Sequence, residues 1–196
     1  IKQQTQEIKI MKEEMENYHM PKGLIISKEY ENNRFSGILS ELVKLNKYNI
    51  NDNGLIKITG KGTGGGTGSL SSLIDYNSNS MYLISDLNKS PMICFGFKNY
   101  SICISAYSVK TSSRYYMRSW VVEGSNDDSN WTILDSHSNN TTMNSSNTAY
   151  TFIINESNIF KLPLRYIRFR LTGENSVGEY AIEVCNIEFF GKLYKS

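Results

Sequence analysis

Residues 119–134 read SWVVEGSNDDSNWTIL, and this stretch decides the fold class. An apolar run begins at Trp120 and stops at a cluster of Ser, Asn and Asp residues, after which Trp131 opens a second run. Asp, Asn and Ser favour tight turns because their side chains hydrogen-bond to the neighbouring backbone. Two short apolar runs on either side of such a turn predict paired antiparallel strands.

The same alternation continues on both sides of this stretch. In MICFGFK, residues 92–98, every second side chain is apolar. In LRYIRFRLTG, residues 164–173, apolar side chains share one parity, whereas Tyr166, Arg168 and Arg170 share the other. Successive strand residues point to opposite faces, so each run has one face for a core. Many short strands without alternating helices predict an all-β antiparallel fold, a sandwich or a barrel.

Two helical segments precede the strands. Residues 1–20 carry apolar residues at heptad spacing and predict a coiled-coil segment over 1–22; a solvated helix lying against the protein is the alternative. A short amphipathic helix is predicted by an apolar stripe at Phe35, Ile38, Leu39, Leu42 and Val43. We therefore expect a coiled coil over 1–22 and a sandwich domain with its lead-in helix over 23–194.

Composition excludes several classes of function. The 196 residues carry a net charge of +2, which is too small for a general nucleic-acid-binding surface. No apolar run is long enough to span a bilayer. Three cysteines are a poor disulfide framework, so we expect a reducing, intracellular compartment.

A glycine run raises the question of a cofactor. Gly60, Gly62 and Gly65 fit the spacing of a dinucleotide-binding loop. Such a loop must lead from a strand into a helix, and the residues that follow are too rich in Ser and Asn for a helix that crosses a sheet. We expect a glycine loop, no cofactor and no catalytic residue, since neither His19 nor His137 lies near a nucleophile in sequence.

Three stretches together resemble discoidin domains, also called factor V/VIII C-type domains. They are the strand–turn–strand at 119–134, the Arg-Tyr-Ile-Arg core at 165–168 and the closing strand IEFFGKL at 187–193. The sequence FSGIL at 35–39 is similar to a helix found in the intracellular branch of that family, which follows BTB-type adaptor domains. The resemblance covers about residues 35 to 193.

The resemblance implies an eight-stranded jelly-roll sandwich of the galactose-binding type that binds and does not catalyse. Our main hypothesis is a scaffold module that docks a protein partner in an adaptor or cytoskeletal assembly, with self-association through residues 1–20. The alternative is a carbohydrate-binding, lectin-like module whose partner is a glycan.

The resemblance also implies candidate sites. Asp75 and Asn77 occupy the turn where relatives hold a structural Ca²⁺, and Glu188 would complete the oxygen ligands. Four further residues are candidates for ligand binding at the rim of the sandwich, by analogy with sugar-binding relatives: Tyr82, Tyr166, Arg168 and Arg170.

Overall fold

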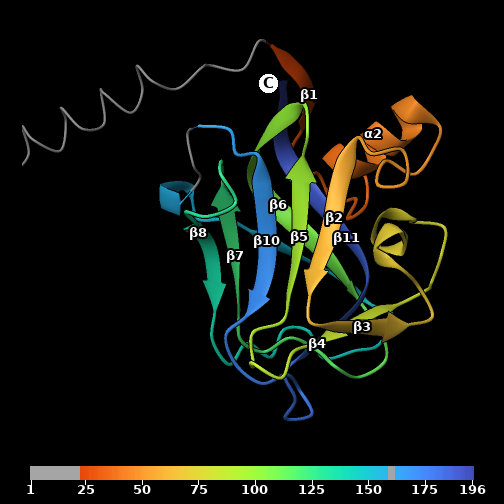
Figure 1. The fold of residues 1–196 in the computed structure, drawn as a ribbon, viewed down its shortest axis with the longest axis vertical. Helices are drawn as coiled ribbons and strands as arrows, with labels where there is room; N and C mark the ends of the chain where they lie inside the picture. The colour runs from red at the N-terminus through yellow and green to blue at the C-terminus, as the bar shows by residue number, and fades with distance from the viewer. Residues whose placement is uncertain (1–22, 159–161) are drawn as a thin grey trace, which may run out of the picture.

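A computed structural model describes residues 23–158 and 162–196, which form two antiparallel sheets packed face to face (Figure 1). Sheet A has the order β3-β4-β11-β6-β9, and β1 also pairs with β11. Its strands are β1 (Leu24–Lys28), β3 (Thr63–Gly66), β4 (Tyr82–Ser85), β6 (Tyr100–Thr111), β9 (Ala149–Ile153) and β11 (Ala181–Lys195). Sheet B has the order β2-β5-β10-β7-β8. Its strands are β2 (Ile56–Lys61), β5 (Met92–Phe97), β7 (Trp120–Ser125), β8 (Thr132–His137) and β10 (Tyr166–Leu171).

The predicted all-β sandwich is confirmed, and alternation in the strands explains it. In β10, Ile167 and Phe169 are buried, whereas Arg168 between them is only half-buried. Phe169 lies opposite Ile93 of β5 and Val122 of β7, so apolar rows run across sheet B on its inner face. The 119–134 stretch forms the β7–β8 hairpin, as predicted.

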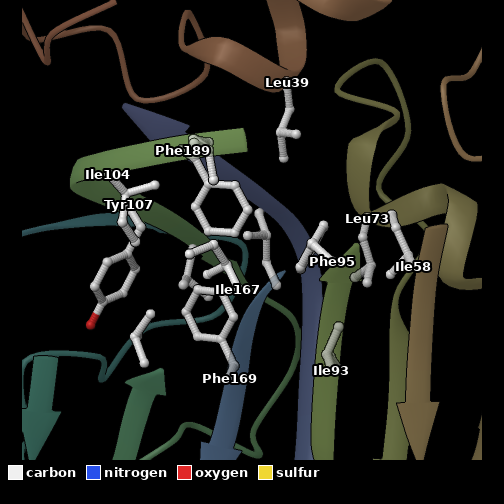
Figure 2. Packing of buried hydrophobic residues seen from close by; sticks show 14 of the residues in the cluster. Leu39, Ile58, Leu73, Ile93, Phe95, Ile104, Tyr107, Ile167, Phe169 and Phe189 are labelled. Atoms are coloured by element: carbon white, nitrogen blue, oxygen red, sulfur yellow. The ribbon is translucent and has the colours of Figure 1, made fainter. Parts of the chain in front are cut away.

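The core lies between the two sheets and is rich in aromatic side chains. Phe189 of β11 contacts Phe95 edge-on at 5.1 Å between ring centroids and stacks with Phe169 at 6.1 Å. Figure 2 shows the rings of Phe189 and Phe169 between the layers, with Ile167 beside them. Complete burial of one such side chain stabilises the fold by about 1.5–3 kcal/mol. These contacts fix how the sheets face each other.

Helix α2 (Ile38–Asn46) confirms the predicted amphipathic helix. Ile38, Leu39 and Leu42 are buried, and the helix packs on β11. A 3-10 helix, η1 (Leu70–Ile74), also packs on β11. Together they cover part of the outer face of sheet A, which explains why almost all of β11 is buried. The other 3-10 helix in the described ranges is η2 (Glu156–Asn158).

The glycine run forms strands where a loop was expected. Gly60 belongs to β2, and Gly64–Gly66 belong to β3, which pairs with β4. Gly62 takes φ +136° at the bend between β2 and β3, a conformation that side chains disfavour. The next helical element is the short η1, so the loop does not lead into a helix that could bind a pyrophosphate.

The predicted coiled coil at 1–22 lies outside the described residues. Within 23–158 and 162–196, no helix is both long and apolar enough to cross a bilayer.

Candidate functional site

The two predicted arginines of β10 bind a neighbouring carboxylate. Arg168 Nε donates to Glu123 Oε2 at 2.7 Å, and Arg170 reaches both Glu123 oxygens with Nε and Nη2 at 3.0 and 2.8 Å. Burial opposes ionisation of Glu123, but these hydrogen bonds outweigh it and lower its pKa. Arg168 also lies over the Trp131 ring, 3.8 Å from its centroid. Both guanidinium groups therefore already have partners in mid-strand, away from the loops of the rim.

The two predicted tyrosines do not join this pair in one site. Tyr82 lies in β4 of sheet A, on the other layer of the sandwich. Tyr166 begins β10 and lies opposite Gly96 of β5. A Cβ at Gly96 would stand only 3.2 Å from Tyr166 Cε1, so the ring lies against the glycine backbone.

Tyr166 borders a groove of ≈410 Å³ at one end of sheet B, which we call the basic groove. Lys57 from β2, Lys98 after β5 and Arg165 before β10 line it, and all three are exposed. The remaining lining residues are Asn51, Gly54, Ile56, Gly96 and Phe97. Among the described residues, the lining thus combines three cations with an aromatic ring and contains no carboxylate.

A larger hollow of ≈840 Å³ lies between α2 and η1, and we call it the α2–η1 cleft. Segments 40–52 and 67–80 supply most of its lining, and Phe35 completes it. Tyr48 is 74% exposed there, and the Tyr76 ring lies 5.3 Å from the Phe35 ring between centroids. The C-cap residue Lys47 takes φ +59°, which ends α2 just before Tyr48.

Several polar groups of the cleft have no partner among the residues that the structure describes. Asp75 Oδ1 accepts the Asn77 N–H at 3.2 Å, and Asp52 Oδ1 accepts the Ser71 hydroxyl. In the described ranges, the second oxygen of each carboxylate, the Asn77 side-chain amide and the Lys47 amine make no hydrogen bond or ion pair. The cleft therefore offers donors and acceptors beside an exposed aromatic ring, an arrangement typical of ligand sites.

The structure gives Glu188 a structural role. Its Oε2 accepts the N–H groups of Gly37 and Ser40 at 3.2 and 3.0 Å, and its Oε1 accepts those of Leu39 and Phe189 at 2.8 and 2.9 Å. Three of these donors belong to the first turn of α2 or to its N-cap. The N-cap residue is Gly37, which has no side chain that could accept from these N–H groups. Burial raises the pKa of Glu188, while the N–H groups oppose the rise. All four neighbours are donors, so the ionised carboxylate is the form that matches them.

The predicted cation turn is held to β11 by hydrogen bonds. Asn186 Nδ2 donates to the carbonyl oxygens of Ser72 and Asp75 at 3.2 and 3.0 Å, and the Tyr76 hydroxyl donates to Ile187 O at 3.0 Å. Within the described ranges, no three His, Cys, Asp or Glu side chains gather closely enough to bind a metal. Asp75 and Asn77 reach the cleft, whereas Glu188 is engaged with α2, so the Ca²⁺ site stays a prediction.

The sequence reasoning missed both hollows. The signal for the cleft was two segments dense in Asn, Ser and Asp that each contain a tyrosine, residues 46–54 and 68–80. The basic groove had no local signal, because Lys57, Lys98 and Arg165 come from three different strand ends.

Comparisons with known proteins were made for sequence and for structure. Neither a family model nor a curated protein matches the sequence. Among solved structures, a CBM32 module from Clostridium perfringens, in complex with GalNAc-β-1,3-galactose, matches with a TM-score of 0.54 and 14% identity, covering 70% of this chain and 96% of that one. Chitosan-binding module 1 of a chitosanase/glucanase from Paenibacillus sp. IK-5 gives the same four values. A family 89 glycoside hydrolase from Clostridium perfringens matches at 0.52 and 17% identity, over 70% of this chain but 14% of that one.

These likenesses establish the galactose-binding-type fold, leave one expectation without support and contradict another. They give no support to the intracellular branch of adaptor proteins. They contradict the main hypothesis of a protein-docking scaffold, because the two modules that match at a TM-score of 0.54 are carbohydrate-binding modules. Resemblance in the strand motifs identified the fold correctly, but those motifs build the core and carry no information about the ligand. The chain shares its fold with carbohydrate-binding modules of the CBM32 type.

Proposed function

We propose that the protein is a non-catalytic carbohydrate-binding module and that the α2–η1 cleft holds a neutral saccharide. The observation that carries the proposal is the cleft itself, whose lining combines the exposed ring of Tyr48 with polar groups that have no partner in the described part of the chain. A sugar ring has C–H groups that pack on an aromatic face and hydroxyls that need both donors and acceptors. Asn77 offers both, Asp75 accepts and Lys47 donates.

The charge of the cleft favours an uncharged ligand. Lys44 and Lys47 line it together with Asp52 and Asp75, so cations and carboxylates balance. A strongly charged sugar would gain little from such a lining. Support for a binding role without catalysis comes from the fold, which the similar modules use to hold GalNAc-β-1,3-galactose or chitosan.

Calorimetry with GalNAc-β-1,3-galactose, followed by a panel of neutral oligosaccharides, tests the proposal. Tyr48→Ala removes an exposed ring with no role in the core, and we expect about tenfold weaker binding, the typical loss for an aromatic anchor. Asn77→Ala should weaken binding severalfold. Tyr115→Ala is the matched control, because that tyrosine lies on the β6–β7 loop, outside the cleft.

Two results would count against the proposal. One is the absence of binding to every neutral glycan of the panel. The other is unchanged affinity in Tyr48→Ala combined with loss in Tyr115→Ala, which would move the site to the β6–β7 loop.

A further inference from the structure

The outer face of sheet B is basic. Lys57 and Lys61 of β2 and Arg168 and Arg170 of β10 all lie at outward positions, on the parity opposite to the core residues. This face is turned toward the viewer in Figure 1, and no helix lies in front of β2, β5 or β10.

The cations of this face fall into two groups. Arg168 and Arg170 share the carboxylate of Glu123, and the β7–β8 turn adds Asp127 and Asp128 nearby in sequence. The cations of the basic groove are different: Lys57, Lys98 and Arg165 have no ion pair in the described ranges, and no carboxylate lines the groove with them.

Three like charges in one groove repel each other, and an anion placed among them relieves that repulsion. The groove also lowers the solvent exposure of any group it holds, which strengthens the attraction. Arg165 adds a planar fork of N–H donors that matches a carboxylate in bidentate geometry. The preferred occupant therefore carries a carboxylate.

An aromatic wall accompanies the charges. The Tyr166 ring lies against Gly96 of β5, and Gly96 is paired with Lys57 of β2 on its other side. A Cβ at this position would lie 3.2 and 3.3 Å from Cε1 and Cδ1, so the ring would have to shift by a few tenths of an ångström to admit it. The groove thus joins cations to a surface on which a ring can pack.

We propose that the basic groove binds an acidic polysaccharide, a chain of sugars that carry carboxylates, and that this site is separate from the α2–η1 cleft. The choice of a saccharide among polyanions rests on the proposed function. Lys57 and Lys61 lie on the same face of β2, four residues or about 13 Å apart. A polysaccharide chain running along β2 from the groove meets the second lysine, so a polymer gains contacts that a single sugar does not.

Affinity electrophoresis and calorimetry of the whole chain with polygalacturonate test the proposal. Fully methyl-esterified polygalacturonate is the matched ligand, since it keeps the sugar chain and loses the charge. We expect binding to the acid form only, and weakening as NaCl rises to about 0.3 M, where screening is strong. The double variant Lys57→Gln/Lys98→Gln should reduce the affinity for polygalacturonate about tenfold, because each substitution removes one charge-assisted contact.

Lys192→Gln/Lys195→Gln is the control, because it removes the same charge from exposed positions of β11 in the other sheet. Tyr166→Ala should also reduce the affinity for polygalacturonate, and it should leave neutral-sugar binding at the α2–η1 cleft unchanged. The Tyr48→Ala variant, in contrast, tests neutral-sugar binding at the α2–η1 cleft alone. The proposal for the cleft and the proposal for the basic groove can therefore fail independently.

Three results would overturn the inference. The first is equal affinity for the esterified and the acid polymer. The second is an equal loss of affinity for polygalacturonate in the groove variant and the control variant. The third is binding of single-stranded RNA or phosphatidylserine vesicles as tight as that of polygalacturonate. The last would show a general polyanion surface.

Discussion

Replacing Glu188 by Gln tests the most deeply buried polar cluster near the cleft. Glu188 is 0% exposed and accepts four backbone N–H groups, two on each oxygen. Gln has nearly the same shape but keeps one acceptor oxygen, so its NH₂ group must face two of those donors. Two buried N–H groups then lose their acceptor.

The expected loss follows from those two groups. A buried donor without a partner costs about 1–3 kcal/mol, and the lost negative charge at the start of α2 costs a few tenths more. We therefore expect Glu188→Gln to lower the free energy of unfolding by about 3 kcal/mol. For a chain of this size that corresponds to a fall in Tm of roughly 6–12 °C.

Urea unfolding followed by tryptophan fluorescence measures the change, with Trp120 in the core as the reporter. Glu31→Gln is the control, because Glu31 is exposed and accepts no hydrogen bond within the described residues; a change below about 0.5 kcal/mol is expected. A loss below about 1 kcal/mol in Glu188→Gln would refute the reasoning. It would mean that residue 188 is a neutral acid, for which Gln is a close substitute.

Two further predictions concern titratable groups. The pKa of Glu123 is lower in the folded protein than in the unfolded chain, where it is about 4.3. The interaction of Glu123 with Arg170 therefore stabilises the fold at pH values above about 4.3, and this stabilisation is lost as the pH falls through the folded pKa. The difference in unfolding free energy between the wild type and Glu123→Gln should accordingly shrink from pH 6 to pH 3 in urea titrations; a constant difference would contradict this. Burial raises the pKa of Cys94 to about 12 and that of Cys103 to about 11. Because the thiolate is the reactive form, iodoacetamide at pH 8 should label both at least about 100-fold more slowly in the native than in the urea-unfolded protein, as followed by mass spectrometry; equal rates would show the prediction to be wrong.

Alternation of side chains was sufficient to predict the layers. A period of two in 164–173 placed Ile167 and Phe169 on the core face, and the structure buries both. The physical reason is local: in any extended strand, adjacent side chains point to opposite faces, whatever the strand pairs with. The first strand, Leu24–Lys28, escaped this reasoning because Leu24 and Ile25 are consecutive and both are exposed.

The sites could not be predicted in this way, because distant segments build them. Glu188 reaches the N-terminus of α2 across 151 residues of sequence from Gly37, so a candidate metal ligand became the cap of a helix. The arginines predicted to hold sugar were paired by Glu123, which lies 45 residues before Arg168.

The sequence by itself determined most of the strands, helix α2 and the apolar face of each, since those depend on neighbours along the chain. Only the tertiary structure decided where polar groups are left without partners. It brought Lys57, Lys98 and Arg165 into one groove and placed Tyr48 and Asp75 in the lining of the cleft. Charge repulsion and unpaired hydrogen-bonding groups exist only once the sheets are packed, and these two properties support the binding functions proposed for this chain.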